Sequence, residues 1–410
     1  MGTVTDVAIV GAGPYGLSLA AHLAAAGLDI RVFGQPMHTW RNRMPEGMVL
    51  KSEGFASNLW HPYGAFTLKD YCADHNLPYQ ETGLPVPLQT FCDYGVAFQN
   101  RFVPMLDERW VTNLERNTNN FTLRLDNDEI VTARRVVIAA GIASFDYIPP
   151  ELDAIAGPLC SHSIQHHLLG GFAGQRVLII GGGASGVGLA ALMSPKGADV
   201  SVAARRGTIP YCSPPRPRSL LERIHEPETG LGYGWRSVAC VYAPMLFYQM
   251  PREFRHLVVR KHLGPAPGWT SREVVERDVS VILGAKLASS RRRGDKAEVT
   301  LRMDSGGENI VEADHVIAAT GFKVDMRRLR FLSRGIMEKL RCADHTPELS
   351  THFETSVPGM FVVGTAAANN FGPLMRFAYG AGFASRRLSA FLVRTAPRRS
   401  LAITQELAAA

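Results

Sequence analysis

The sequence is short of the residue patterns that build disulfide, zinc or membrane-spanning structures. Its six cysteines are widely spaced, form no C-x-x-C pair and show no Cys/His spacing typical of zinc sites. We therefore expect isolated, reduced thiols in a cytoplasmic protein without bound metal. No run of 18 or more apolar residues occurs, which predicts no membrane span. The first predicted strand begins near residue 6, which leaves no length for a signal peptide.

Charge of one sign is not concentrated anywhere in the chain either. The 410 residues carry a formal net charge of +7, with lysine and arginine scattered and no RNA- or DNA-binding motif beside them. We therefore assign the excess positive charge to a basic surface and to phosphate-bearing ligands, not to nucleic acid. The length and the 46% content of hydrophobic residues predict a globular protein of two or three domains.

A glycine-rich fingerprint of the form G-x-G-x-x-G occurs twice. Residues 11–16 read G-A-G-P-Y-G after the apolar run 7–10, and residues 181–186 read G-G-G-A-S-G after the apolar run 177–180. In such a strand–turn–helix unit the first glycine makes the turn, the second admits a pyrophosphate, and the third lets helix and strand pack closely. Two dinucleotides are therefore expected, the first at Gly11, Gly13, Pro14, Tyr15 and Gly16 and the second at Gly181, Gly183, Ala184, Ser185 and Gly186.

The residues that follow each unit distinguish the two dinucleotides. Arg205 and Arg206 come directly after the second strand of the second unit, where arginine accommodates the 2′-phosphate of NADP. A solvated basic turn is the alternative interpretation. In the first unit, Gly34 and Gln35 stand where an acidic residue usually binds the ribose, so another group must make that contact. We assign FAD to the first unit and NADPH to the second.

Hydrophobic periodicity predicts further elements around these units. Strands are expected at 110–116, 121–125, 129–133, 135–140, 279–283, 298–303, 309–312, 316–319 and 360–363, and helices at 66–76, 90–102, 184–193, 252–262, 271–276 and 373–393. The stretch 36–105 is too long for a plain connection, so we predict a helical insertion that covers the first cofactor.

The order of these elements predicts an α/β protein with two Rossmann-like dinucleotide-binding domains, the NADPH domain being inserted in a discontinuous FAD domain. The last predicted strand is expected to complete the first sheet from the far end of the chain. The predicted boundaries are 1–155 and 323–395 for the FAD domain, 156–322 for the NADPH domain with an insertion at 207–270, and 396–410 for a tail. Hydride transfer requires the two cofactors to meet in the crevice between the domains.

Three short strings outside the fingerprints carry a family pattern. Residues 314–322 read D-H-V-I-A-A-T-G-F, and residues 155–162 read I-A-G-P-L-C-S-H. Gly364 and Thr365 follow the last predicted strand. Together with the order of the two fingerprints, these strings make nearly the whole chain resemble the class B flavin-dependent monooxygenases, in particular the lysine/ornithine N-hydroxylase-like branch.

The strings depart from the family patterns at single positions. The N-hydroxylase motif D-x-x-x-(L/F)-A-T-G-Y would have leucine or phenylalanine at Ala318 and tyrosine at Phe322. The family string F-x-G-x-x-x-H would have phenylalanine at Ile155 and one residue fewer before His162. Thr365 stands where related flavoproteins often carry an aspartate that binds an FAD ribose or phosphate, and threonine cannot supply that carboxylate.

The resemblance implies a reaction. NADPH reduces FAD, oxygen adds to the reduced flavin as a C4a-(hydro)peroxide, and this species oxygenates a small molecule. N-hydroxylation of an amine is slightly favoured over oxygenation of sulfur and over Baeyer–Villiger oxygenation of a ketone. The implied partners are a small-molecule substrate and O2, and a homo-oligomer is left open.

The resemblance also implies positions for individual side chains. Lys51, Ser52 and Asn58 lie where the family places polar residues near the flavin ring, and they are the catalytic candidates. Trp40 either packs against FAD or fills the core of the first insertion. Further contacts are expected for FAD from Gly364, Thr365, Phe371 and Gly372, the last two preceding a predicted helix, and for NADPH from Thr320 and Gly321.

Two other functions remain open at this point. In the first, reduced flavin passes electrons to a ferredoxin or a quinone; transfer to a disulfide is disfavoured because the chain has no C-x-x-C. In the second, the protein binds FAD and NADPH without turnover, as a redox sensor or scaffold. The missing acids at Gly34 and Thr365 favour this second alternative slightly.

Overall fold

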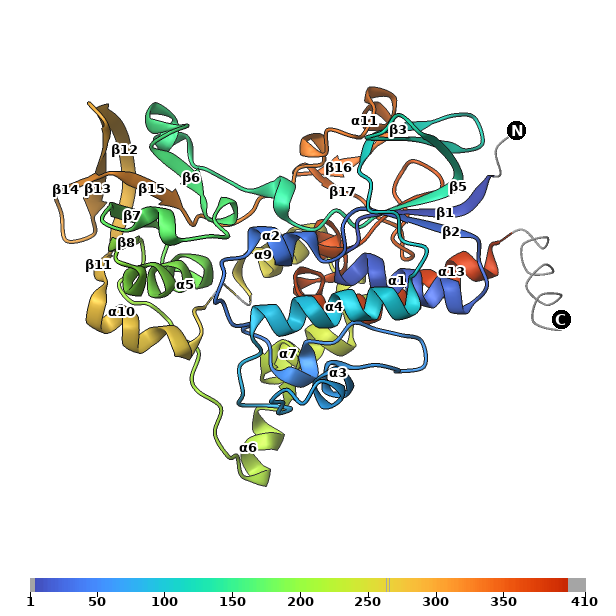
Figure 1. The fold of residues 1–410 in the computed structure, drawn as a ribbon, viewed down its shortest axis with the longest axis horizontal. Helices are drawn as coiled ribbons and strands as arrows, with labels where there is room; N and C mark the ends of the chain where they lie inside the picture. Colours follow the sequence, from blue (N-terminus) through green and yellow to red (C-terminus); the bar gives the residue numbers. More distant parts are fainter. Residues whose placement is uncertain (1–3, 263, 265, 397–410) are drawn as a thin grey trace.

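The computed structural model describes residues 4–262, 264 and 266–396, and it contains two α/β bodies that lie side by side. In Figure 1 one body surrounds β1 and β5, and the other surrounds β7 and β8, with a group of helices below them. The predicted α/β fold with two dinucleotide-binding units is confirmed. The predicted tail falls almost entirely outside the described residues.

The first sheet is built from both ends of the chain. Its parallel part has the order β2–β1–β5–β18, and an antiparallel pair, β4 and β3, continues from the first half of β5. The strands are β1 (Thr5–Val10), β2 (Ile30–Phe33), β3 (Val111–Arg116), β4 (Phe121–Leu125), β5 (Ile130–Ile138) and β18 (Met360–Val362). Because Val362 pairs with Ile138, the last strand of the chain lies in the same sheet as the first strand.

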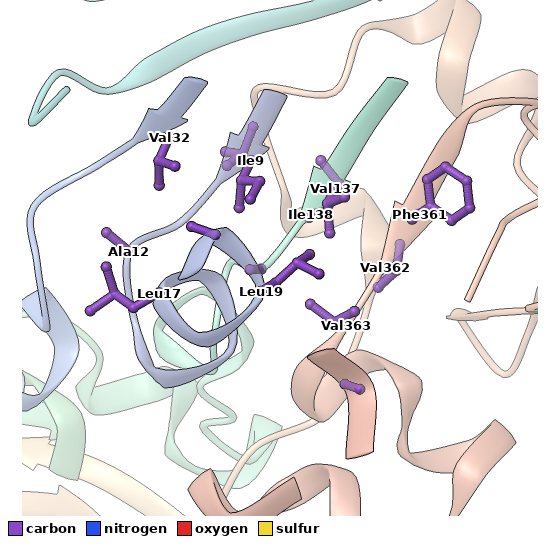
Figure 2. Packing of buried hydrophobic residues seen from close by; sticks show 14 of the residues in the cluster. Ile9, Ala12, Leu17, Leu19, Val32, Val137, Ile138, Phe361, Val362 and Val363 are labelled. Carbon is purple, nitrogen blue, oxygen red and sulfur yellow. The ribbon is translucent and has the colours of Figure 1, made fainter. Parts of the chain in front are cut away.

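Two helices from opposite ends of the chain pack against each other beside this sheet, α1 (Pro14–Ala25) and α13 (Ala381–Arg394). Figure 2 shows Ile9, Val137 and Val362 on neighbouring strands above the helix that carries Leu17 and Leu19. These five side chains are at most 1% exposed, as expected for parallel strands that are covered on their faces.

The second sheet has five parallel strands in the order β11–β8–β7–β15–β6. They are β6 (Cys160–His162), β7 (Arg176–Ile180), β8 (Asp199–Ala204), β11 (Ser280–Leu283) and β15 (His315–Ala318). An antiparallel sheet and two helices flank them, namely β12 (Ala285–Arg293), β13 (Lys296–Met303), β14 (Glu308–Ala313), α5 (Ala184–Met193) and α10 (Arg272–Asp278).

Helices inserted after β2 and after β8 supply the rest of the molecule. The first group is α2 (His38–Arg43), α3 (Leu68–Asp74) and α4 (Leu88–Phe102). The second group, here called the helical insertion, is α6 (Leu220–His225), α7 (Trp235–Tyr242), α8 (Pro244–Gln249) and α9 (Arg252–Lys261). Although the helical insertion leaves the second sheet, α8 and α9 pack on α12 (Ala368–Phe371) of the first body.

Two predictions of secondary structure were wrong. The strands expected at 129–133 and 135–140 are one strand, β5, because its first half pairs with β4 and its second half with β18. The helix expected at 373–393 begins only at Ala381, after two 3-10 turns separated by extended backbone at Phe377. The Tyr15 hydroxyl lies 3.1 Å from the Met375 carbonyl and 2.9 Å from the Phe377 carbonyl, which also accepts from the Gly380 amide at 3.0 Å within a 3-10 turn.

Candidate functional site

The first fingerprint forms a turn that only glycine can make at its two ends. Gly11 has φ +115°, and a Cβ there would lie 2.3 Å from the Ala139 carbonyl oxygen. A Cβ on Gly16 would lie 1.9 Å from the Gly11 carbonyl oxygen. Around Gly13, by contrast, no atom lies within 4 Å of a built Cβ. The loop is therefore closed by Ala139 and by its own backbone at its two ends, and open at its centre.

The open centre of this loop is the start of α1. Gly13 is the N-cap and Pro14 the first helical residue, and no side chain caps the helix. The first amide to find a carbonyl is that of Leu17, which donates to Gly13 O at 2.9 Å. The amides of Tyr15 and Gly16 are thus available to an anion, which the helix dipole also favours.

Residues from the far end of the chain lie against this loop. Gly364 follows β18 with φ +78°, and its Cβ position is 3.5 Å from the Tyr15 ring. Thr365, next in sequence, is partly exposed. Burial raises the pKa of the Tyr15 hydroxyl, so this group stays a neutral hydrogen-bond donor. The structure therefore brings the two predicted halves of the first site together.

Phe371 and Gly372, the other predicted FAD contacts in this part of the chain, pack against aromatic side chains of the protein. Phe371 is fully buried, with ring centroids 4.1 Å from Phe353 and 5.4 Å from Tyr248. Gly372 has φ +93°, and a Cβ there would meet the Phe247 ring at 3.3 Å. The helix N-terminus expected at this point is absent, because a 3-10 turn follows Gly372 and the helix starts only at Ala381.

Trp40 lies on α2 and is half-buried. Its ring meets the Phe91 ring of α4 edge-on, with centroids 4.9 Å apart. It therefore packs within the first helical group.

The three catalytic candidates make no hydrogen bond to one another in the described part of the chain. Lys51 is exposed, and the Ser52 hydroxyl bonds the Ser57 hydroxyl at 2.7 Å. Both ends of the Asn58 amide are engaged by backbone: Nδ2 donates to Phe55 O at 2.9 Å and Oδ1 accepts from Leu68 N at 2.8 Å. Asn58 thus satisfies the first amide of α3, which gives it a structural task.

Replacing Asn58 by alanine is expected to destabilise the protein by about 1–2 kcal/mol, because a first-turn amide and a carbonyl lose their partner together. Urea unfolding followed by circular dichroism measures this loss. Lys51→Ala is the matched control and should lie within about 0.5 kcal/mol of wild type, since the side chain is exposed. An Asn58→Ala protein of wild-type stability that has lost activity would instead support a catalytic task.

The second fingerprint repeats the geometry of the first. Gly181 has φ +130°, and a Cβ there would lie 2.4 Å from the Ala319 carbonyl oxygen. A Cβ on Gly186 would lie 1.9 Å from Gly181 O. Gly183 is the N-cap residue of α5, and no side chain caps this helix. The first amide of the helix with a backbone partner is that of Val187, which donates to Gly183 O at 3.0 Å. The amides before it, at Ala184, Ser185 and Gly186, are available to a phosphate.

Arg205 and Arg206 follow the last residue of β8, beside the end of β7 from which the second fingerprint starts. Both side chains are exposed. Within the described part of the chain neither guanidinium pairs with a carboxylate. Two free cations at this strand end fit the phosphate-binding role predicted from the sequence.

Thr320 and Gly321 lie where the chain crosses back between the two bodies. The Thr320 hydroxyl donates to the Tyr147 carbonyl of the outgoing crossing, and Tyr147 N donates to Gly321 O at 3.1 Å. His162 is fully buried beside them, with Nε2 3.0 Å from Gly321 O and its ring edge-on to Phe322 at 5.2 Å. The two crossings thus form one hydrogen-bonded junction.

Next to this junction His166 and His315 lie around Ser161, a cluster that the sequence did not indicate. Ser161 Oγ on β6 lies 2.6 Å from His166 Nε2 and 2.7 Å from His315 Nε2. Burial, followed by repulsion from His315 and His162, lowers the pKa of His166 to about 4. Burial also lowers the pKa of His315. Because Ser161 and His315 are far apart in sequence, no local spacing signals this contact.

The histidine group predicts acid sensitivity of the fold. The pKa of His166 is lowered from 6.5 in the unfolded chain, so the contribution to stability is complete above pH 6.5 and is lost as pH falls toward 4. The loss amounts to roughly 3 kcal/mol at most. Urea unfolding at pH 7 and pH 4.5 should therefore differ less for His166→Gln than for wild type. His225→Gln, at an exposed position, should leave the difference unchanged.

None of the helices in the part of the chain that the structure describes is both long and apolar enough to cross a membrane.

Comparison with known proteins agrees with this architecture. Residues 5–236, more than half of the chain, match the model of the pyridine nucleotide-disulphide oxidoreductase family. Indole-3-pyruvate monooxygenase YUCCA1 of Oryza sativa subsp. japonica is 28% identical over 214 residues, 49% of this chain and 48% of that protein. Ferredoxin–NADP reductase of Acidiphilium cryptum (strain JF-5) is 33% identical over 105 residues, 25% of this chain and 31% of that protein. The chain therefore spans about half of the first relative and a third of the second.

A solved structure matches over nearly the full length. The ornithine N-hydroxylase of Kutzneria sp. 744, whose description names reduced FAD, NADP+ and L-ornithine, superposes with a TM-score of 0.72. The match covers 96% of this chain and 99% of that one at 16% sequence identity. At this identity the likeness is one of fold, and it confirms the fold expected from the resemblance to class B flavin monooxygenases.

Proposed function

Because the chain belongs to the pyridine nucleotide-disulphide oxidoreductase family, we propose that it is an FAD- and NADPH-dependent monooxygenase that oxygenates a small molecule. The observation that carries this proposal is the presence of two uncapped glycine-rich loops in one fold that matches an N-hydroxylase from end to end. N-hydroxylation of an amine is the favoured reaction.

The first loop fits the pyrophosphate of FAD. A Cβ at Gly13 would enter open space beside free helix amides, whereas Gly11 and Gly16 are closed by protein atoms. Pro14 and Tyr15 start the helix, and Gly364, just after β18, lies against the Tyr15 ring with Thr365 next in sequence. FAD therefore fits here even though Gly34 and Thr365 supply no carboxylate for the ribose.

The second loop fits NADPH. Gly181 and Gly186 shape it, and Ala184 and Ser185 present amides at the start of α5. Arg205 and Arg206 would contact the 2′-phosphate through charge-assisted hydrogen bonds. We place the boundary between the FAD and NADPH domains at the junction of Tyr147 with Gly321, near the predicted boundaries.

When bound, NADPH supplies a hydride and the flavin supplies the centre at which oxygen is activated. The chain itself would bind and orient the two cofactors and enclose the site at which they meet. The paired crossings fix how the two bodies face each other, and the Tyr15 hydroxyl ties the segment after Gly372 to the first fingerprint. The helical insertion, by packing on α12, holds the two bodies together from a second side.

Electron transfer to ferredoxin is the second candidate function, because the ferredoxin–NADP reductase match has the higher sequence identity, although over a quarter of the chain. Reduction of a disulfide is disfavoured despite the family's name. All six cysteines are free, and four of them are buried, namely Cys72, Cys92, Cys160 and Cys240.

Product analysis under isotopic oxygen tests the proposal. The flavin-loaded protein is incubated with NADPH, 18O2 and single amines such as L-ornithine or L-lysine, then with sulfides and ketones. We expect one substrate class to gain a single 18O atom with matching consumption of NADPH. NADPH oxidation that yields only hydrogen peroxide with every class, together with rapid reduction of ferredoxin or a quinone, would establish the reductase instead. No NADPH oxidation at all would point to a sensor.

A further inference from the structure

A cavity of about 370 Å³ lies between the helical insertion and the first body. Tyr248 of α8 and three residues of α9 line one side, and the hairpin of β16 (Cys342–Ala343) and β17 (Thr346–Pro347), with α12, lines the other. None of the lining residues belongs to either glycine-rich loop. The cavity is therefore distinct from the two glycine-rich loops, and it borders α12 on the side of Asn369 and Asn370.

The lining is rich in cations. Arg252, Arg255 and Arg341 face two carboxylates, Glu348 and Glu354. Both carboxylates already have partners, since Glu348 lies 3.7 Å from Arg341, and Glu354 accepts from the Gly359 amide at 2.8 Å. Arg252 lies 3.5 Å from Glu253, so Arg255 is the lining arginine that has no carboxylate within 4 Å among the described residues.

Arg255 is the least satisfied of these cations. Of its five N–H donors one is used, with Nη1 donating to the Asn370 carbonyl at a long 3.4 Å. Its Nε is buried without a hydrogen-bond partner, and no carboxylate pairs with the side chain in the described residues. Burial lowers the pKa of this guanidinium, and the nearby charges of Glu253 and Glu348 do not offset that effect.

The guanidinium is nevertheless held in place. Arg255 lies over the Tyr248 ring at 5.6 Å, and the Tyr248 hydroxyl donates to the Leu349 carbonyl at 3.0 Å. Asn370, whose carbonyl Arg255 contacts, is itself fixed by the Pro347 carbonyl at 2.9 Å and the Leu349 amide at 3.2 Å. A fixed, under-used fork of donors is the usual arrangement for recognition of carboxylate or phosphate.

We propose that this cavity binds a small oxyanion, a phosphate or carboxylate group, through Arg255 with Arg252 and Arg341 beside it. The bound anion would supply the missing counter-charge between α9 and the β16–β17 hairpin. It would therefore fasten the helical insertion to the first body. The site is independent of the proposed oxygenation.

Calorimetric and thermal titrations test the site in the flavin-loaded protein saturated with NADP+, so that both dinucleotide sites are filled. Sodium phosphate, sodium acetate and sodium citrate are titrated separately at constant ionic strength against sodium chloride. We expect saturable heat and a rise in Tm with at least one oxyanion and with no chloride series. The strongest ligand of the three then identifies phosphate or carboxylate as the preferred group.

Arg255→Gln should weaken that binding at least about tenfold, the effect of losing one charge-assisted contact. Arg260→Gln, exposed on the same helix and outside the cavity, should bind as wild type does. If Arg255→Gln fails to fold, the double variant Arg252→Gln/Arg341→Gln, which changes two exposed residues, replaces it in the test. This variant should bind the oxyanion about tenfold more weakly than wild type. Absence of saturable binding in wild type, or equal binding by the cavity variants, would overturn the proposal.

Discussion

Alanine at Gly13 is expected to give a folded protein that no longer retains FAD. The residue has φ −85° and ψ −172°, which alanine adopts freely, and its Cβ would touch no protein atom. Stability of the flavin-free protein should stay within about 0.5 kcal/mol of wild type. The methyl group would instead occupy the space through which a pyrophosphate approaches the helix amides, so flavin affinity should fall at least about a hundredfold.

Gly16→Ala should behave in the opposite way. Its Cβ would lie 1.9 Å from Gly11 O, so α1 cannot stay in place against β1, and we expect a loss of about 3 kcal/mol or an unfolded product. Absorbance at 450 nm per protein measures flavin retention, and urea unfolding measures stability. Gly188→Ala, where a Cβ meets nothing, is the control and should change neither. Full flavin content in Gly13→Ala would contradict the assignment of this loop.

The double variant Arg205→Ala/Arg206→Ala is expected to lose at least about a hundredfold in kcat/KM for NADPH. Each guanidinium–phosphate contact contributes about 1.5–3 kcal/mol, and a factor of ten corresponds to about 1.4 kcal/mol. The kcat/KM for NADH should change little, because NADH has no 2′-phosphate. Stopped-flow reduction of the flavin by each nucleotide separates the two effects.

The double variant Arg223→Ala/Arg236→Ala serves as the matched control for the arginine pair. It removes the same two charges from exposed positions on α6 and α7. If the pair and the control lower NADPH use equally, the effect is one of overall charge. If the pair keeps the wild-type preference for NADPH over NADH, the two residues do not contact the phosphate.

The parts of the fold that the sequence predicts are those in which neighbouring residues carry the information. The two glycine loops follow from the spacing of Gly11 and Gly16, and of Gly181 and Gly186, and from the apolar strands before them. The helix 184–193 is predicted to the residue because its glycine N-cap and its alanine-rich run are contiguous. Closure of the first sheet by β18 was likewise predicted from the apolar run that ends at Gly364.

The wrong predictions of secondary structure concern segments whose conformation depends on residues far away in the sequence. Whether residues 129–140 make one strand or two depends on β4 and β18 as common partners of β5. Before α13 the chain runs through two 3-10 turns, and the distant Tyr15 hydroxyl contacts the Met375 and Phe377 carbonyls of this segment. The packing of α9 on α12, and with it the cavity around Arg255, has no signal in either segment alone.

Catalytic side chains are the least predictable part of the site. The family pattern indicates Asn58, but its side-chain amide bonds the Phe55 carbonyl and the Leu68 amide. Its role near a flavin ring stays a prediction that the paired stability and activity measurements above decide. The proposed oxygenation would need an enclosed flavin more than a fixed triad of side chains, so composition and spacing carry little information about its catalytic residues.

The pairing of Val362 with Ile138 has a consequence for biosynthesis. During translation all five strands of the second sheet, which lie between residues 160 and 318, leave the ribosome before β18 does. The NADPH-binding unit can therefore fold early, while the second half of β5 waits with an unpaired edge, a state prone to association with other chains. We expect flavin to be incorporated only after synthesis is nearly complete, and nascent chains stalled before residue 360 to lack it.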